Sequence, residues 1–412
     1  MLMITLAVVG AGSRGTTYAG HAVRHGARVV AVAEPDDVRR AKAAAEHPEA
    51  EAFTDWRHLA ERPRLADAVI IATQDAGHVE PAVRLAGLGY HILLEKPMAV
   101  REEDCAAIVA AAERAGVIFA VCHVLRYTPY TRATKALVGS GRIGEVVSVQ
   151  HLEPVGWWHH AHSFVRGNWR RSDESTFMLL AKSCHDLDWL HHIVGRRVVR
   201  ASSFGGLHHF RPENRPAGAA DRCLDCAVET TCPYSAKRTY LSFVGDPRRE
   251  SWPLSVLTPD ATEQGVLRAL REGPYGRCVY DCDNDVVDHQ VVNLEFEGGA
   301  SASFTMTAFT PLAFRKTRIF GTHGSIEGDG HVLTVTDFLT GATEEIDVAE
   351  GGPSAADGHG GGDGALVRAF LDAIAQDDPG LILSDPRESL HSHQVAWAAE
   401  RSRLTGAVVT VP

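Results

Sequence analysis

The feature that most constrains the fold is a glycine loop that directly follows an apolar run near the N-terminus. The run Leu6-Ala7-Val8-Val9 leads into Gly10-Ala11-Gly12-Ser13-Arg14-Gly15, and a helical pattern follows over 16–25. This G-x-G-x-x-G spacing is typical of dinucleotide-binding domains. The first glycine permits a tight turn, the second lets the backbone approach the pyrophosphate, and the third allows the helix to pack closely on the strand. The start of the helix then offers free N–H groups and a partial positive charge to the phosphates.

An acidic residue stands where such a domain needs one. Glu34 ends the second apolar run, ~20 residues after the glycine loop, where a carboxylate binds the adenosine ribose hydroxyls. The same carboxylate would repel the 2′-phosphate of NADP, so the sequence favours NAD. Arg39 and Arg40 are close enough in sequence to reach a phosphate, but a solvated helix face accounts for them better.

Residues 1–125 alternate short apolar runs with helical patterns. Buried parallel strands are predicted at 6–9, 29–33, 68–72, 91–94 and 117–122. Helices are predicted between them, at 16–25, 37–46, 80–88 and 102–115. This alternation predicts an α/β fold whose N-terminal part is a doubly wound Rossmann domain.

The pattern changes after Arg126, and we expect a second, substrate-binding and dimerisation domain over 126–412. Helices are predicted at 131–138, 177–194, 365–375 and 386–404, and strands at 146–151, 291–296, 300–308, 316–321, 331–337 and 408–411. These elements predict an α+β domain with a large, mainly antiparallel open sheet. Residues from about 205 to 282, rich in Gly, Pro and Cys, are predicted to form an irregular insertion. Residues 351–364 are predicted to be a glycine-rich linker, with Asp363 capping the helix that follows.

Composition and charge argue against several partners. The 412 residues are 45% hydrophobic and 23% charged, with a formal net charge of -11 and acidic residues spread along the chain. These values are typical of a globular protein and argue against nucleic acid or an anionic membrane surface as the main partner. No stretch approaches the ~20 apolar residues of a membrane span, and the first apolar run enters the glycine loop rather than a cleavage site. We therefore expect a soluble, cytoplasmic protein.

Two further segments carry a family resemblance. Residues 70–78 read Ile-Ile-Ala-Thr-Gln-Asp-Ala-Gly-His, and residues 94–97 read Leu-Glu-Lys-Pro. Together with the glycine loop they resemble the glucose–fructose oxidoreductase/inositol dehydrogenase/MocA family, over nearly the whole chain. The resemblance implies that Lys96 lies beside the nicotinamide and polarises the reacting hydroxyl, and that the bond before Pro97 is cis. It also implies a set of cofactor contacts: Gly10, Gly12, Ser13, Arg14, Gly15, Glu34, Thr73, Gln74, His78, Glu95 and Lys96.

The position of Lys96 is also chemically reasonable. A lysine at the carboxyl edge of a parallel strand lies at the crevice where ligands bind such sheets. Partial burial there would lower its pKa toward a range useful for proton transfer. The alternative is a surface lysine that forms a salt bridge with Glu95.

A second catalytic group is predicted in the segment Ala181-Lys182-Ser183-Cys184-His185-Asp186-Leu187-Asp188. It resembles the family's helix motif D-x-G-x-H-x-x-D, which implies that His185 is the acid–base group. Asp188 is three residues further on, so it can share a helix face with His185 and orient its ring. The chain departs from the motif, because Ala181 replaces the first aspartate. Lys182, beside it, is predicted either to rearrange the proton path or to bind an anionic substrate.

A polar, aromatic stretch over 157–170 is predicted to form a substrate wall. Tryptophan rings stack on sugar rings, while Arg and His donate hydrogen bonds to hydroxyls or acids. Metal binding by the histidines of this stretch is less favoured, since they lack an i, i+4 pair and a nearby carboxylate; simple loop packing is the other alternative. The expected substrate contacts are Arg126, Tyr127, Trp158, His162, Arg166, Trp169 and Asp188.

Five of the eight cysteines fall between 223 and 282. In a reduced cytosol such clustering favours thiolate ligation of zinc over disulfides. We expect a structural zinc site of four thiolates, from Cys223, Cys226, Cys232 and either Cys282, which we prefer, or Cys278. Free or redox-active thiols, an iron–sulfur cluster and a disulfide are the alternatives.

These residues favour an NAD-dependent oxidoreductase that acts on a secondary hydroxyl of a sugar, cyclitol or glycoside. In it Lys96 polarises the oxygen and His185 takes the proton as hydride leaves. The alternative is an NAD-dependent glycosidase that oxidises, eliminates and hydrates, on an anionic sugar such as sulfoquinovose. A non-catalytic NAD-binding regulator fits less well, because Lys96 and His185 are both present. The resemblance also implies a homo-oligomer formed through the second domain's sheet.

Overall fold

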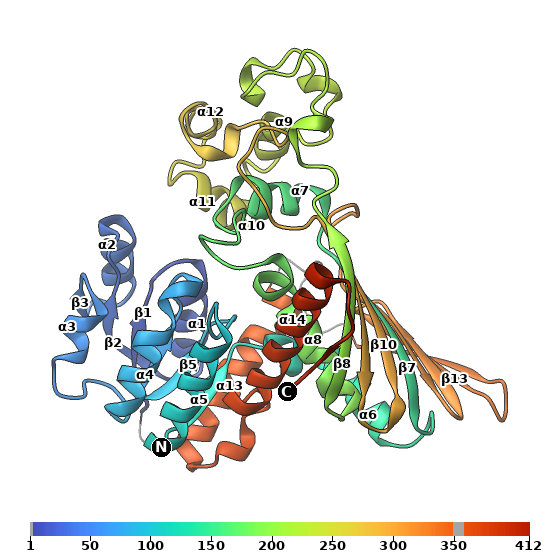
Figure 1. Ribbon diagram of the computed structural model, residues 1–412. Coiled ribbons are helices and arrows are strands. Elements are labelled where there is room, and N and C mark those ends of the chain that lie inside the picture. The colour runs from blue at the N-terminus through green and yellow to red at the C-terminus, as the bar shows by residue number, and fades with distance from the viewer. Residues whose placement is uncertain (1–2, 349–357) are drawn as a thin grey trace.

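The computed structural model describes residues 3–348 and 358–412. A six-stranded parallel sheet in the order β3-β2-β1-β4-β5-β6 forms the N-terminal part, with helices on both faces (Figure 1). Its strands are β1 (Thr5–Val9), β2 (Arg28–Ala33), β3 (Glu51–Phe53), β4 (Ala68–Ile71), β5 (His91–Leu94) and β6 (Phe119–Val121). Its helices are α1 (Ser13–Arg24), α2 (Asp37–Glu46), α3 (Trp56–Ala60), α4 (Val79–Gly87) and α5 (Glu102–Ala115). The predicted Rossmann domain is confirmed; β3 and α3 are additional to the prediction.

A helix from the far end of the chain completes the core of this first sheet. In α13 (Gly362–Gln376), Leu366, Val367 and Phe370 are buried together with Val8 and Tyr18 of the β1–α1 unit. The helix does not begin as predicted, because Gly361 occupies the N-cap position and the Asp363 carboxylate accepts hydrogen bonds from Arg14 instead. Part of the predicted linker, 351–357, lies outside the described residues.

The second sheet has nine strands in the order β14-β13-β12-β11-β7-β10-β9-β8-β15. Among the described strands of this sheet only β7 and β10 pair in parallel, so the predicted mainly antiparallel sheet is confirmed. Its strands are β7 (Val146–Pro154), β8 (Val198–Gly206), β9 (His289–Phe296), β10 (Ser301–Thr307), β11 (Lys316–Gly321), β12 (Gly324–Gly328), β13 (Val332–Asp337), β14 (Thr343–Asp347) and β15 (Val409–Thr410). Helices α6 (Pro129–Gly139), α8 (Met178–Val194) and α14 (Pro386–Thr405) lie on the face toward the first sheet (Figure 1).

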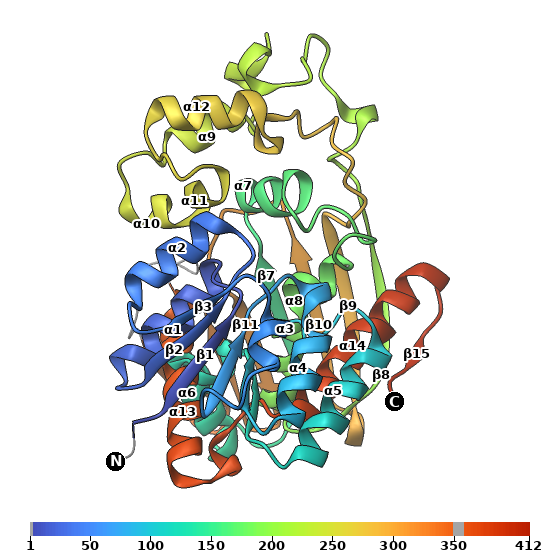
Figure 2. The same cartoon turned by 90° about the vertical axis from the view of Figure 1, so that its left-hand side faces the viewer.

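The predicted insertion forms a cap of short helices above both sheets (Figures 1 and 2). It contains α9 (Ala236–Leu241), α10 (Pro247–Arg249), α11 (Ser255–Leu257) and α12 (Glu263–Glu272), and it stacks near α7 (Trp157–His160). A small core around Tyr240, Val266 and Leu270 holds it together. Within the described residues, no helix has the length and apolar character needed to cross a membrane.

Candidate active site

The glycine loop between β1 and α1 has the shape of a dinucleotide cradle. A Cβ atom on Gly10, whose φ is +91°, would lie 2.5 Å from the carbonyl oxygen of Ala72, and one on Gly15 would lie 1.9 Å from the carbonyl oxygen of Gly10. A Cβ on Gly12 would meet nothing within 4 Å. Helix α1 begins at Ser13 with no side-chain cap, so its first N–H groups are available to a ligand. The open space at Gly12 beside these donors therefore fits a pyrophosphate.

Glu34 is anchored beside this loop. One carboxylate oxygen accepts the backbone N–H of Ala11 at 2.8 Å, and the other accepts the N–H of Asp36 at 3.0 Å and a guanidinium nitrogen of Arg39 at 3.1 Å. A carboxylate has about four acceptor positions, so one is left for a ribose hydroxyl. Arg39 therefore pairs with Glu34 rather than merely lying on a solvated face, and Arg40 donates to the Glu34 carbonyl oxygen.

The residues around β5 fix the direction of the Lys96 side chain. The bond before Pro97 is cis, as the resemblance implies. Glu95 does not pair with Lys96 as the surface alternative supposes, because its carboxylate receives Arg14 at 2.7 Å. His78 is fully buried, and its ring nitrogens lie 2.8 Å from the Pro97 carbonyl oxygen and 3.3 Å from that of Thr73. His78 therefore supports the turn that carries Lys96.

Lys96 reaches across to the second domain. Its Nζ donates to the carbonyl oxygen of Ala181 at 2.7 Å. Ala181 is the residue that replaces the family's first aspartate, so a backbone carbonyl holds the lysine where that carboxylate is missing. His185 lies one turn further along α8. Two groups that are far apart in the sequence, the predicted hydroxyl-binding lysine and the predicted acid–base histidine, thus come together beside the glycine loop.

His185 is buried, with 5% of its surface exposed. Its Nδ1 has no hydrogen-bond partner among the described residues. Burial lowers the pKa of His185 well below its usual value, and the nearby Lys96 cation lowers it further. The imidazole is therefore neutral at neutral pH and able to accept a proton. The rings of His123 and His359 lie 5.7 and 6.0 Å from it, centroid to centroid.

A buried charge network extends from Lys182 to the second sheet. Lys182 Nζ lies 3.2 Å from a Glu153 oxygen, and Arg315 Nε lies 2.7 Å from the other Glu153 oxygen and 2.8 Å from Asp186. Burial opposes the ionisation of Asp186, but Arg315 and the adjacent His151 more than offset it and lower its pKa. Burial lowers the pKa of Lys182, whose side chain keeps 20% of its surface exposed. Arg315, Glu153 and Asp186 belong to no recognisable short motif, so their roles cannot be predicted from the sequence alone.

Asp188 does not orient His185. Its two oxygens accept Arg126 in a bidentate pair at 2.7 and 2.8 Å. Burial opposes the ionisation of Asp188, but Arg126 lowers its pKa to about 2. Tyr127 is buried too, and its hydroxyl lies 3.0 Å from Ser384 Oγ. Arg126, Tyr127 and Asp188 are therefore buried and paired with other groups of the protein, and they are not exposed.

The predicted substrate wall divides between the cap and the domain junction. His162 is buried with Nδ1 2.8 Å from the Tyr240 hydroxyl. Arg166 is buried and donates to the carbonyl oxygens of Arg277 and Tyr234. Trp158 packs under the Arg249 guanidinium within the cap. Trp169 contacts the first domain, where its Nε1 donates to Asp75 at 3.0 Å.

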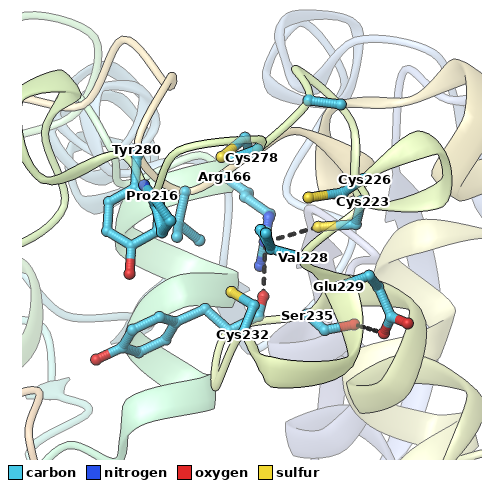
Figure 3. A pocket seen from close by; sticks show the side chains of 14 residues that line it. Arg166, Pro216, Cys223, Cys226, Val228, Glu229, Cys232, Ser235, Cys278 and Tyr280 are labelled. Carbon is cyan, nitrogen blue, oxygen red and sulfur yellow. Dashed lines mark hydrogen bonds between the residues drawn. The ribbon is translucent and has the colours of Figure 1, made fainter.

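The cysteines of the cap surround a small cavity of about 20 Å³ (Figure 3). Cys223, Cys226, Cys232 and Cys278 line it, whereas Cys282 does not and instead contacts the Cys278 carbonyl oxygen. Of the two expected fourth ligands, Cys278 therefore lies at the cavity with the other three cysteines and Cys282 does not. Among the described residues no group of three or more His, Cys, Asp or Glu side chains is arranged to hold a metal ion. The arrangement of the cysteines therefore does not support the expected zinc site.

Comparison with known proteins identifies the class of protein that this fold and site define. Residues 4–123 match the oxidoreductase family with an NAD-binding Rossmann fold, and residues 135–411 match that family's C-terminal alpha/beta domain. The chain therefore belongs to the glucose–fructose oxidoreductase/inositol dehydrogenase/MocA family.

Individual relatives show the range of reactions in this family. The chain is 30% identical over 208 residues to 2,7-anhydro-N-acetylneuraminate hydratase of Mediterraneibacter gnavus, covering 50% of this chain and 53% of that protein. It is 30% identical over 179 residues to inositol 2-dehydrogenase 2 of Saccharopolyspora erythraea, covering 43% and 49%. The chain thus spans about half the length of these relatives. The crystal structure of an oxidoreductase domain protein from Kribbella flavida shares the fold, with a TM-score of 0.73 over 100% of both chains at 21% identity.

Proposed function

We propose that the protein is an NAD-dependent oxidoreductase that acts on a secondary hydroxyl of a sugar, cyclitol or glycoside. The observation that carries the proposal is the meeting of Lys96 and His185 beside the glycine loop, through the 2.7 Å contact of Lys96 with Ala181 on the His185 helix. The proposal agrees with the relatives of this chain, which include a hydratase of an anhydrosugar and an inositol dehydrogenase. Glu34 beside the loop favours NAD over NADP.

The side chains divide the chemistry between them. Lys96 donates a hydrogen bond to the hydroxyl oxygen and stabilises negative charge that develops there. His185, neutral because it is buried, removes the hydroxyl proton through a ring nitrogen. When bound, NAD supplies the hydride acceptor. Glu95 and Arg14 hold the lysine-bearing turn against the glycine loop, so the two reacting ends of the site keep their spacing.

A redox-neutral reaction is the second candidate, favoured by one observation. A hydratase, which adds water with no net oxidation, is among the relatives of half the chain. The two candidates differ in one readout. Net oxidation accumulates NADH. Cleavage by oxidation, elimination and hydration, followed by return of the hydride to the carbonyl carbon, releases the leaving group and leaves the NADH level unchanged. Absorbance of NADH and release of a glycoside's leaving group, followed together, separate them.

Lys182 is proposed to bind an acidic group of the substrate. Its ammonium is partly exposed near Lys96, and it shares Glu153 with Arg315, so it is oriented but not fully neutralised. Lys182→Met should raise KM for an acidic sugar on the order of 10- to 100-fold, as expected for loss of a charged hydrogen bond. Lys182→Arg, which keeps the charge, should recover most of the loss. Equal effects on a neutral and an acidic sugar in steady-state kinetics would refute this role.

Structural zinc is proposed for the cysteine-lined cavity, with Cys278 as the fourth ligand. Its volume suits one ion. Cys223 Sγ accepts the backbone N–H of Ala236 at 3.4 Å and approaches Arg166 at 3.6 Å. Burial raises the pKa of the Cys232 and Cys278 thiols. Hydrogen bonds from the backbone N–H groups of Tyr234 and Tyr280 offset part of this rise. Such donors, and the Arg166 cation, would stabilise the charge of four thiolates bound to one ion.

Metal analysis tests this zinc site. Protein purified without chelators should contain about one zinc ion per chain. Cys223→Ser with Cys226→Ser should lose the metal and lower the melting temperature, because the cap has only a small core of its own. Cys282→Ser is the matched control and should keep its zinc. Zinc-free wild-type protein, or loss of zinc from the control alone, would contradict the assignment.

We also propose that two copies pair through the open face of the second sheet. On that face Phe204 of β8, which pairs with Val291 of β9, leaves 66% of its surface exposed. A second copy that packs on this face would bury that side chain.

A further inference from the structure

The glycine-rich segment before α13 carries a histidine in an unusual backbone conformation. His359 has φ +50° and ψ 42°, in the left-handed region that costs a non-glycine residue free energy. The segment that holds it is pressed against the first domain, since a Cβ on Gly362 would lie 2.3 Å from the Val124 carbonyl oxygen. Non-glycine residues in such strained backbone conformations are common at active sites, where the surrounding structure compensates the strain.

A buried carboxylate orients the His359 ring. Nδ1 of His359 lies 3.2 Å from Asp363 Oδ2, and the Asp363 side chain is only 1% exposed. Arg14 holds the other Asp363 oxygen at 2.6 Å and binds Glu95 at 2.7 Å. The His359 ring is therefore connected through Asp363 and Arg14 to Glu95, the residue that precedes Lys96. Because the two nitrogens of an imidazole lie on opposite sides of the ring, Nε2 of His359 faces away from Asp363.

His359 lies at the reaction site and remains accessible. Its ring centroid is 6.0 Å from that of His185, and its side chain is 30% exposed. One substrate can thus contact both rings. Oxidation of a hydroxyl needs one acid–base group, for the hydroxyl proton, and His185 already serves. A second oriented imidazole has no task in that step, but an elimination has one for it, because the departing oxygen must gain a proton.

We propose that His359, held by Asp363, is a second acid–base group of this site that protonates a leaving oxygen; this rests on the proposed function. After oxidation, His185 gives its proton to solvent and then removes the proton on the carbon beside the new carbonyl. The electron pair of that C–H bond forms a C=C bond. The bond from the next carbon to the leaving oxygen breaks with its electrons on oxygen, and that oxygen takes a proton from the His359 ring. Water then adds to the C=C bond, losing its proton to His359 while the neighbouring carbon regains a proton from His185. The carbonyl carbon finally takes the hydride back, so that the reaction causes no net oxidation. The inference identifies the substrate class as a glycoside or internally bridged anhydrosugar.

Leaving-group dependence tests the role. A panel of sugars and sugar acids first identifies a sugar that reduces bound NAD, and its methyl and 4-nitrophenyl glycosides are then compared. With His359→Gln, release of methanol should fall on the order of 10²- to 10⁴-fold, the usual contribution of a general acid. Release of 4-nitrophenolate, which needs no proton, should fall far less, and reduction of NAD by the free sugar should persist. His58→Gln, exposed on α3, is the matched control.

The outcomes separate this inference from the function on which it rests. Equal loss on both glycosides, or no loss on either, would overturn the role of His359. If the wild type reduces NAD with the sugar but releases no leaving group from either glycoside, the oxidoreductase proposal stands and the elimination is wrong. If no sugar in the panel reduces NAD, both proposals fail.

Discussion

Lys96→Met is expected to abolish turnover while NAD binding stays intact. Methionine keeps the length of the side chain but loses the ammonium that contacts Ala181 and would hold the hydroxyl oxygen. The turn itself should survive, because Arg14 holds Glu95 and His78 contacts the Pro97 carbonyl oxygen. A fall in kcat/KM on the order of 10³-fold is expected for loss of this group. Steady-state rates and calorimetric titration with NAD measure the two effects separately.

The control for this variant is Lys42→Met. Lys42 lies on α2 with 70% of its side chain exposed. Its replacement should change neither the rate nor NAD binding. A Lys96→Met enzyme that turns over near the wild-type rate would remove Lys96 from the chemistry, and one that no longer binds NAD would give it a structural role instead.

Acidification below pH 6 is expected to destabilise the protein strongly. Burial lowers the pKa of four fully or almost fully buried histidines from 6.5, to about 4 for His123 and His160 and to about 3 for His162 and His393. In the unfolded chain these rings regain ordinary pKa values, so between pH 6.5 and the lower values the unfolded state binds more protons. Stability is therefore fully present above the unfolded pKa and is lost as the pH falls.

The size of this effect follows from the same values. A fall in pKa from 6.5 to about 4 corresponds to on the order of 3 kcal/mol of unfolding free energy for one histidine, at ~1.4 kcal/mol per tenfold change in proton affinity. Thermal unfolding followed by circular dichroism from pH 7.5 to 4.5 should show a melting temperature lower by on the order of 10 °C. A melting temperature that is flat over this range would contradict the account.

His160 offers a matched variant for this prediction. Its ring stacks on Phe164 and Phe210, and neither ring nitrogen has a hydrogen-bond partner among the described residues. His160→Phe should therefore be tolerated at pH 7.5 and should make the loss of stability on acidification less steep. His58→Gln, on the surface, should leave the slope unchanged.

The sequence was sufficient for the parts of the fold that depend on local pattern. Five of the six parallel strands of the first domain, all except β3, and helices such as α2 and α5 follow from apolar periodicity. Strands β8 and β14 gave no such pattern, because β8 ends in Ser-Ser-Phe-Gly-Gly and β14 is mostly acidic and exposed. Tertiary pairing across the sheet, rather than local propensity, determines them.

The site was predictable only where a motif spans a few residues. Lys96 and His185 were identified because each lies in a short motif. The partner of Asp188, Arg126, is 62 residues away, and Arg315 is 129 residues from Asp186. His359 sits in a run of glycines that indicates a linker when read locally. Burial and long-range pairing decide these roles, and neither is visible in one sequence.

The central claim is that Lys96 and His185 together drive hydride transfer from a secondary hydroxyl. The most direct measurement is the absorbance of NADH in a single turnover, with the NAD-loaded enzyme mixed with sugars, cyclitols and sugar acids. The account predicts that at least one of these compounds produces NADH with the wild-type protein and none with Lys96→Met or His185→Ala, while both variants still bind NAD. NADH formed at the wild-type rate by both variants would contradict it.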